Sequence, residues 1–307
     1  MKVLVTGGTG VVGKAAVDHL LKAGHTVRLL SRHADADARQ WSSGVEPHTG
    51  SVSSDEAVAG AADGCEAVLH VAGIVAESPP ESTFTEVNVE GTRRLAREAK
   101  RAGVRRFVYV SSYGADVGES DYHRSKFAAE EVVRAEAPPG WLVVRPGNVY
   151  GPGDDVISLM LKMVRTLPAI PLIGTGGQPF QPVWMDDLGV ALARAVERTE
   201  PSETVVNLMG PDVTTMRWYC ELVEYTTSSA YWSTVCGPVA SEPPKPRLMT
   251  GSPGNRLAVG QPTMLELPTN RTLRSGKEFW LSHCSKRAIA SAKRVGSGSA
   301  TCARAAS

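Results

Sequence analysis

The chain has 307 residues, of which 42% are hydrophobic and 21% are charged. A chain of this length can bury a full core without disulfides or metal ions, and its composition is too apolar for wholesale disorder. The net charge of +1 gives no reason to expect a nucleic-acid partner or an acidic membrane surface. No apolar run reaches the roughly 18–20 residues of a membrane span, and glycines follow Met1 closely where a signal peptide needs an apolar core. We therefore expect a cytoplasmic globular protein with about two domains.

The average charge conceals two unlike segments that meet after Arg217. Residues 218–307 contain eleven Lys and Arg residues, five Glu and no Asp, a net charge of +6, whereas residues 1–217 have a net charge of −5. The second segment shows no sustained helical or strand periodicity. We predict that it is an irregular basic tail, either disordered or the product of a shifted reading frame or aberrant fusion. A genuinely divergent tail is the alternative.

Apolar strands alternate with helical segments through the first 217 residues. Such strands, separated by helices, imply right-handed βαβ crossovers and a parallel sheet with helices on both faces. We therefore predict a doubly wound α/β architecture. In chain order, the patterns predict strands at 2–6, 27–30, 67–71, 106–111, 142–145 and 205–208, and helices at 11–23, 84–102, 122–135, 155–166 and from Asp186 to about 198.

A glycine-rich turn follows the first predicted strand. Gly7, Gly10 and Gly13 are spaced three apart and lead into the first predicted helix. Gly7 and Gly10 allow a tight turn and a close approach to a pyrophosphate, and Gly13 allows the helix to pack close to the sheet. The helix N-terminus then offers free N–H groups and a partial positive charge to phosphates. The turn predicts a dinucleotide site, with a glycine-rich loop that holds no ligand as the alternative.

The end of the second predicted strand indicates which dinucleotide is bound. An NAD site usually places Asp or Glu there to bind the ribose 2′-hydroxyl. This chain instead has Ser31 and Arg32 directly after Leu30. An arginine at this position can bind a 2′-phosphate, which favours NADP over NAD; an ordinary exposed arginine is the alternative.

A tyrosine and a lysine lie four residues apart on the predicted helix at 122–135. Tyr122 and Lys126 therefore share one helix face. An ammonium group near a phenol favours the phenolate, so we expect Lys126 to lower the pKa of Tyr122 toward neutral pH. Ser111 and Ser112 end the preceding strand, at the edge of a parallel sheet where α/β proteins bind ligands.

Together these features resemble the short-chain dehydrogenase/reductase superfamily, most closely its extended and atypical branch with the NAD-dependent epimerases and dehydratases. The resemblance spans roughly residues 1–217 and implies a Rossmann fold. The motifs that carry it stand in family order: residues 6–13, His70-Val71-Ala72-Gly73, Asn88-Val89-Glu90-Gly91-Thr92, Ser111-Ser112, Tyr122 with Lys126, residues 145–153 and residues 182–187.

The resemblance implies hydride transfer between nicotinamide and a small carbonyl or alcohol substrate. Ser112 would hydrogen-bond the substrate oxygen, with Ser111 as the fallback, Tyr122 would exchange the proton, and Lys126 would tune Tyr122 and bind the ribose. The predicted cofactor-binding residues are Thr6, Gly7, Gly8, Thr9, Gly10, Val11, Val12, Gly13, Ser31, Arg32, Val71, Ala72, Gly73, Asn88, Tyr122, Lys126, Pro146, Gly147, Asn148 and Val149. For Asn88 a packing or capping role is an equal alternative.

The implied domains are an NAD(P)-binding Rossmann domain at residues 1–150, a small substrate-binding α/β lobe at 151–217 and the tail at 218–307. Only ten positions separate Ser112 from Tyr122, a spacing that is similar to the atypical branch with the complex I accessory subunit. A non-catalytic NADP(H)-binding regulatory or scaffold protein is therefore the alternative function. The histidines and cysteines do not converge at ligand spacing, so no metal site is predicted. The sequence does not indicate an oligomeric state.

Overall fold

The computed structural model describes residues 1–218 except 156–157, 160–161, 164–165, 167–174 and 199–202. Within this part the chain divides into two compact units, one formed by residues 1–154 and 182–210 and the other by residues 155–181 and 211–218. The predicted basic tail, apart from Trp218, lies outside the described residues, as does part of the predicted helix at 155–166. The three predicted domains, with their two boundaries after residues 150 and 217, stay predictions.

The first unit contains a seven-stranded sheet in the order β10-β6-β5-β4-β1-β2-β3, and all of its neighbouring strands are parallel. The chain moves outward from β1 to β3 in one direction and from β4 to β10 in the other. The order reverses between β1 and β4, which is where open α/β sheets bind ligands. The strands are β1 (Lys2–Thr6), β2 (Thr26–Ser31), β3 (Val45–Thr49), β4 (Ala67–His70), β5 (Arg106–Val110), β6 (Trp141–Pro146) and β10 (Thr204–Leu208).

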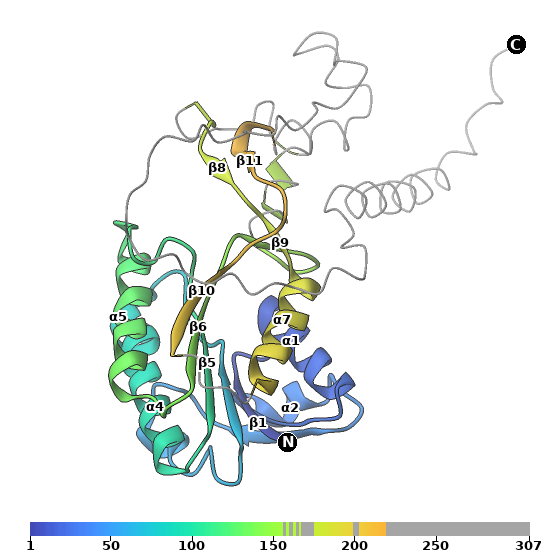
Figure 1. Ribbon diagram of the computed structural model, residues 1–307, viewed down its shortest axis with the longest axis vertical. Coiled ribbons are helices and arrows are strands. Elements are labelled where there is room, and N and C mark those ends of the chain that lie inside the picture. Colours follow the sequence, from blue (N-terminus) through green and yellow to red (C-terminus); the bar gives the residue numbers. More distant parts are fainter. Residues whose placement is uncertain (156–157, 160–161, 164–165, 167–174, 199–202, 219–307) are drawn as a thin grey trace, which may run out of the picture. The chain divides into compact units, whose positions relative to one another are not determined.

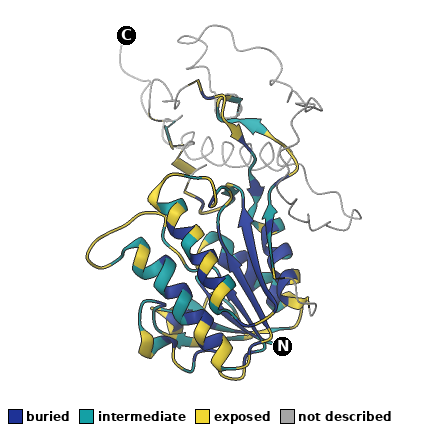
Figure 2. Ribbon diagram, turned by 60° about the vertical axis from the view of Figure 1, so that its left-hand side comes forward, coloured by how far each residue is buried: buried dark blue, intermediate teal, exposed yellow. Residues whose placement is uncertain are grey.

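Helices cover both faces of this sheet (Figure 1). On one face, α1 (Val11–Lys22) and α7 (Met185–Glu197) pack on strand residues such as Val3 and Val5. On the other face, α3 (Asp55–Val58), α4 (Gly91–Arg101) and α5 (Asp121–Glu136) pack on residues such as Leu4. Successive strand residues thus enter opposite cores, as the two-residue period of a strand requires. The central strands β1, β4, β5 and β6 are almost continuously buried (Figure 2), and the prediction of a doubly wound Rossmann-type sheet is confirmed.

The predicted helix at 84–102 divides into two parts. A π-helix, η1 (Thr85–Glu90), precedes α4. The Asn88 side chain lies buried within η1, and the Thr92 hydroxyl donates to the Asn88 carbonyl at 2.6 Å. A single π-turn inside a helix often marks a functional site, because it redirects one side chain without ending the helix.

The remaining elements are short. A five-residue helix, α2 (Ala34–Ala38), follows β2. In the first unit β7 (Val149–Tyr150) pairs in parallel with β9 (Val183–Trp184), and in the second β8 (Pro179–Phe180) pairs antiparallel with β11 (Thr214–Thr215). No helix among the described residues is long and apolar enough to cross a membrane.

The N-terminus of α7 lies one residue before the predicted start at Asp186. The N-cap residue is Trp184, and Asp186 lies in the first turn, where its carboxylate accepts a hydrogen bond from His19 Nε2 at 2.7 Å. The carboxylate is therefore used to join α7 to α1 instead of capping its own helix.

The contact between α1 and α7 depends on Gly189. A Cβ atom at this position would lie 2.8 Å from the carbonyl carbon of Ala15 and 2.9 Å from its oxygen. Gly189→Ala would ordinarily stabilise a helix interior by about 0.5–1 kcal/mol. Here we expect the free energy of unfolding, measured by urea denaturation, to fall by about 1–3 kcal/mol because the core is overfilled.

The control for this variant is Arg194→Ala, an exposed change on the same helix, which should alter the free energy of unfolding by less than about 0.5 kcal/mol. A Gly189→Ala protein more stable than the wild type would contradict the close helix contact.

Candidate active site

The glycine-rich turn lies at the end of β1, beside the point where the strand order reverses. Gly7 has φ +68°, and a Cβ atom there would lie 2.6 Å from the Ala72 nitrogen. A Cβ atom at Gly13 would lie 2.1 Å from the Gly7 oxygen. Gly10 differs, because its Cβ would meet only the Gly7 oxygen, at 3.6 Å, and the residue is exposed. Gly7 and Gly13 are thus required by the fold, whereas Gly10 leaves an open approach to its backbone.

The N-terminus of α1 opens on the same side. Gly10 is its N-cap residue and has no side chain to bond the N–H groups of the first turn, and the first turn contains no acidic residue. These N–H groups therefore present a partial positive charge. Thr9 and Gly10 are exposed, and Val11 and Val12 are half-buried. This cradle fits a pyrophosphate, so the residues present are compatible with a nicotinamide dinucleotide.

Thr6, which the resemblance assigns to the cofactor, is fully buried and bonded within the protein. Its hydroxyl accepts from the Ala72 N–H at 3.2 Å and lies 2.7 Å from His70 Nδ1. On the other side of the ring, His70 Nε2 lies 3.0 Å from the Thr92 hydroxyl, which already donates to the Asn88 carbonyl. His70 must then donate from Nε2 and accept at Nδ1 from Thr6. Burial lowers the pKa of His70 to about 3, so the ring is neutral.

Asn88 lies buried between the segment after β4 and the helix α5. Its Oδ1 accepts from the Ile74 N–H at 2.8 Å, and its Nδ2 donates to the Ile74 carbonyl at 3.1 Å and to Ser125 Oγ at 2.9 Å. Ser125 in turn donates to the Tyr122 carbonyl. These hydrogen bonds favour the packing role that the sequence left open for Asn88, because they connect the segment after β4 to the helix that contains Tyr122.

Ser112 and Tyr122 lie together, whereas Ser111 is used elsewhere. Ser111 is buried, and its hydroxyl donates to Glu130 Oε1 at 2.6 Å. The Ser112 hydroxyl donates to the Tyr113 carbonyl at 3.5 Å, and the Ser112 side chain also interacts with the Tyr122 phenol, whose pKa it lowers; both residues are half-buried. Of the two neighbouring serines, Ser112 is thus the one whose side chain interacts with the Tyr122 phenol.

Lys126 is buried one helical turn after Tyr122. Its Nζ donates to the Val110 carbonyl at 2.8 Å and lies 4.6 Å from the centre of the Tyr109 ring. A Cβ atom on Gly73 would lie 3.4 Å from the same nitrogen, so the segment after β4 passes beside it. Burial lowers the pKa of Lys126 to about 7, although the Glu130 carboxylate opposes this shift.

The expectation that Lys126 lowers the pKa of Tyr122 is wrong for this structure. Burial raises the pKa of Tyr122, and the hydrogen bond with Ser112 opposes the change without cancelling it. The physical reason is that both groups share a desolvated environment, which disfavours the phenolate and the ammonium alike. Tyr122 is therefore a protonated phenol at neutral pH.

At the end of β2, the structure adds a carboxylate that local sequence reasoning missed. Arg32 is exposed, and the Ser31 hydroxyl donates to Asp37 Oδ2. Asp37 comes from α2, six residues after Ser31 in the chain. The edge of the sheet where the ribose was predicted to bind thus has the exposed Arg32 and, bonded to the residue before it, the carboxylate of Asp37.

The predicted nicotinamide loop follows β6. The Pro146 carbonyl accepts from the Tyr113 N–H at 2.9 Å, Gly147 donates to the Leu208 carbonyl at 3.0 Å, and the Asn148 carbonyl accepts from Val183 at 2.9 Å. The Tyr113 bond ties this loop to the segment that begins with Ser112. Val149 continues into β7, and Val71 donates to the Thr6 carbonyl from the neighbouring segment.

Sequence reasoning missed a buried ionic cluster next to the site. Arg145 donates from two nitrogens to the two carboxylate oxygens of Glu130, each at 2.7 Å, and its third nitrogen lies 2.6 Å from Asp116 Oδ2. Glu130 is fully buried. The spacing of Glu130 four residues after Lys126 placed both residues on one face of α5, but the partner of Glu130, Arg145, comes from the strand β6.

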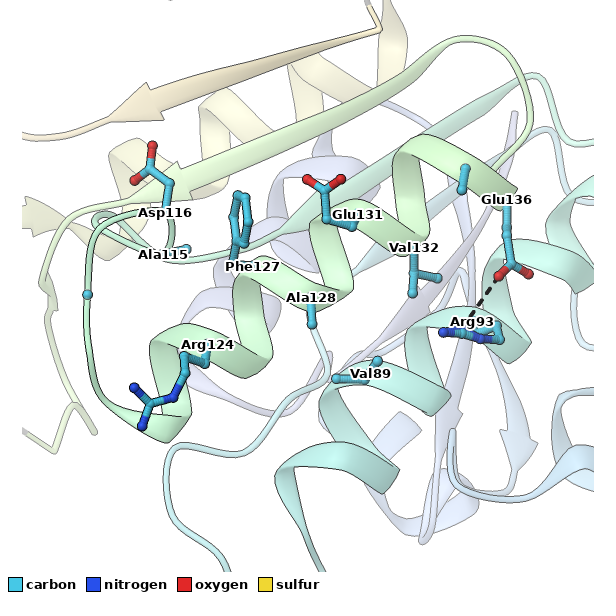
Figure 3. A pocket seen from close by; sticks show the side chains of 12 residues that line it. Val89, Arg93, Ala115, Asp116, Arg124, Phe127, Ala128, Glu131, Val132 and Glu136 are labelled. Atoms are coloured by element: carbon cyan, nitrogen blue, oxygen red, sulfur yellow. Dashed lines mark hydrogen bonds and ion pairs between the residues drawn. The ribbon is translucent and has the colours of Figure 1, made fainter.

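A groove of about 590 Å³ lies along the other side of α5, between that helix and η1 with α4 (Figure 3). Its lining includes Val89, Arg93, Ala128 and Val132, but not Ser112, Tyr122 or Lys126. The groove is therefore separate from the candidate active site. Within the part of the chain that the structure describes, no three His, Cys, Asp or Glu side chains gather as metal ligands do.

Comparison with known proteins gives one family for most of this region. The sequence profile of the NAD dependent epimerase/dehydratase family matches residues 3–208. The chain is 36% identical over 172 residues to a ceramide reductase from Caulobacter vibrioides, covering 56% of this chain and 53% of the relative. It is 29% identical over 227 residues to subunit 9 of the NADH dehydrogenase [ubiquinone] 1 alpha subcomplex of Arabidopsis thaliana, covering 71% and 56%. The chain spans about half the length of these curated relatives.

Among solved structures, the fold is similar to that of DesIV, a dTDP-glucose 4,6-dehydratase from Streptomyces venezuelae with NAD and TYD bound. The TM-score is 0.64 and the identity 24%, with coverage of 76% of this chain and 83% of that one. At this identity the likeness establishes the fold, which agrees with the seven-stranded parallel sheet.

The buried position of Lys126 predicts a specific dependence of stability on pH. Its pKa in the folded protein is about 7, below that of an unfolded lysine, so above pH 7 the unfolded state binds more protons. The free energy of unfolding should therefore rise with pH by roughly 1 kcal/mol per unit between pH 7 and 9 on account of this residue. Lys126→Met should abolish that increment, as measured by urea denaturation at pH 7, 8 and 9.

The comparison with the wild type subtracts the contribution of groups that titrate independently of Lys126. Lys100→Met, an exposed change on α4, should keep the wild-type slope. Parallel curves for the wild type and Lys126→Met would mean that the Lys126 ammonium is not desolvated.

Proposed function

This chain belongs to the NAD-dependent epimerase/dehydratase family, and on that premise we propose that it is an NAD(P)-dependent oxidoreductase or epimerase-like enzyme acting on a small carbonyl or alcohol substrate. The observation that carries the proposal is the meeting of Ser112, Tyr122 and Lys126 at the carboxyl edge of the sheet, beside an open dinucleotide cradle. Three such groups at one ligand-binding edge support chemistry on the ligand as well as its binding.

In this proposal the chain supplies proton transfer and orientation. A bound nicotinamide dinucleotide supplies hydride transfer. The Ser112 hydroxyl holds the substrate oxygen next to the phenol of Tyr122. Because burial keeps Tyr122 protonated, the phenol can donate its proton to that oxygen during carbonyl reduction and accept it back during oxidation.

Lys126 has two roles in the proposal. Its buried Nζ is fixed by the Val110 carbonyl and lies against the segment after β4, where the ribose hydroxyls would bind. Its ammonium form would also stabilise the negative charge that develops on the Tyr122 oxygen as the phenol gives up its proton. With a pKa near 7, the lysine can change charge within the neutral range.

The proposed cofactor is NADP, with NAD as the alternative. Exposed Arg32 at the end of β2 can bind a 2′-phosphate by paired N–H donors. Asp37, bonded to Ser31, supports the alternative, because a carboxylate at this edge accepts hydrogen bonds from ribose hydroxyls and repels a phosphate. The family name also supports the alternative, because it names NAD as the cofactor.

A second candidate function is a non-catalytic NADP(H)-binding regulatory or scaffold protein. The similarity to a named NADH dehydrogenase subunit favours it, because that relative covers more of this chain than the ceramide reductase does. The same fold can bind a dinucleotide without turnover. The retained Ser112, Tyr122 and Lys126 side chains favour the enzyme.

Tyr122→Phe separates these two functions. The phenylalanine keeps the ring but cannot transfer a proton, so turnover of a carbonyl substrate with NADPH should fall at least about 100-fold. NADPH affinity, measured by titration, should change less than about twofold. Tyr113→Phe, at an exposed tyrosine next to Ser112 in the segment before α5, is the matched control. Unchanged turnover in Tyr122→Phe would refute the proposed role of the phenol.

Arg32→Ala tests the choice of cofactor. The dissociation constant for NADPH should rise by roughly tenfold, because a charge-assisted hydrogen bond is lost, while that for NADH stays within about twofold. Arg39→Ala, another exposed arginine near the end of α2, serves as control. If the wild type binds NADH as tightly as NADPH and Asp37→Ala weakens NADH binding, NAD is the cofactor.

A further inference from the structure

Three tethers hold the segment that begins with Ser111. At its start, the Ser111 hydroxyl donates to Glu130 Oε1 at 2.6 Å. In its middle, the Tyr113 N–H donates to the Pro146 carbonyl at 2.9 Å. Farther on, Asp116 Oδ2 lies 2.6 Å from Arg145 Nη1. Ser112 is the residue between the first two tethers, so its backbone is restrained on both sides.

The three tethers converge on one buried ion pair. Glu130 is completely buried and Arg145 nearly so, and the two are joined by paired hydrogen bonds of 2.7 Å. Pro146 directly follows Arg145 on β6. Glu130 also lies one helical turn after Lys126 on α5, so the same pair is connected to the helix of Tyr122. The cluster thus joins β6, α5 and the Ser112 segment.

Such an arrangement is costly, which argues for a purpose beyond packing. A buried ion pair is often no more stabilising than apolar residues of the same volume. Here the pair extends outward to Asp116, a half-exposed residue on the loop before α5, which Figure 3 shows apart from the helix. Arg145 donates two hydrogen bonds to one carboxylate and pairs with a second through its remaining nitrogen. The planar guanidinium therefore fixes how the two carboxylates are oriented, which a lysine ammonium could not do.

We propose that Arg145 and its two carboxylate partners, Glu130 and Asp116, are positioning residues that hold the Ser112 hydroxyl next to Tyr122 and thereby set the rate of proton transfer. This inference rests on the proposed oxidoreductase function. Among the described residues, no hydrogen bond or ion pair joins these three side chains to Ser112 or Tyr122; they act through the Ser111 hydroxyl and the backbone of residues 112–116.

Asp116→Ala tests the inference at the most exposed tether. We expect kcat for carbonyl reduction to fall about five- to tenfold while KM for NADPH changes less than twofold, because the cofactor cradle is on other elements. Asp116→Asn, which can still accept a hydrogen bond from Arg145, should recover part of the lost kcat. Asp121→Ala is the matched control, since Asp121 is an exposed carboxylate on the next element that pairs with Arg124 at 2.9 Å.

Hydrogen exchange supplies a readout that does not require turnover. In Asp116→Ala the Tyr113 amide should exchange at least tenfold faster than in the wild type, and in Asp121→Ala it should not. Wild-type kcat and unchanged Tyr113 protection in Asp116→Ala would overturn the inference. Equal losses of kcat, NADPH affinity and melting temperature would also overturn it, as general destabilisation.

The two proposals fail in distinguishable ways. If the wild type binds NADPH but turns over no carbonyl or alcohol, the enzyme function fails, and so does the catalytic part of the inference, while faster Tyr113 exchange would still establish the tether. If the wild type is active and only the Asp116 variants behave like the control, the inference alone fails.

Discussion

The direct packing of Gly7 against Ala72 is the constraint on which the site depends. The end of β1 passes so close to the segment after β4 that a Cβ atom on Gly7 would lie 2.6 Å from the Ala72 nitrogen. The first turn of α1 passes equally close to the end of β1, because a Cβ atom on Gly13 would lie 2.1 Å from the Gly7 oxygen. These contacts bring two adjacent strands and a helix N-terminus to one point, where the strand order reverses. The cradle for a pyrophosphate follows because the only unfilled position in the turn is Gly10.

Desolvation governs the chemistry beside this cradle. His70, Lys126 and Tyr122 all have pKa values shifted by burial toward their neutral forms. Glu130 remains buried because Arg145 meets both of its oxygens. Removing one partner of such a pair generally costs about 3–5 kcal/mol, since a charge is left without compensation. The site thus combines neutral hydrogen-bonded groups, which set orientation, with one fully paired charge that holds the loop of Ser112.

A chain of hydrogen bonds connects the glycine turn to the helix that contains Tyr122. Because Thr92 donates to the Asn88 carbonyl, His70 must donate to Thr92 and accept from Thr6, which leaves the Thr6 oxygen to accept from Ala72. Asn88 extends the connection to Ser125 and so to the helix of Tyr122. The π-helix over Thr85–Glu90 carries Asn88 within this connection. A conventional helix through 84–102, as the periodicity predicts, would present that side chain at a different angle.

The sequence by itself determined most of the strands and helices of the sheet unit, the glycine turn and the placing of Tyr122 and Lys126 on one helix face, because these depend on period and on residues near one another in the chain; the short elements α2, β3 and α3 carried no such period and were not predicted. Only the tertiary structure decided that the Ser111 hydroxyl bonds Glu130, that Asp37 bonds Ser31, and that burial raises the pKa of Tyr122 despite the opposing interaction with Ser112. Arg145 lies fifteen residues from Glu130 on another element. The reason is physical: hydrogen-bond partners and desolvation are properties of the assembled core, and no local pattern specifies which distant side chain will share it.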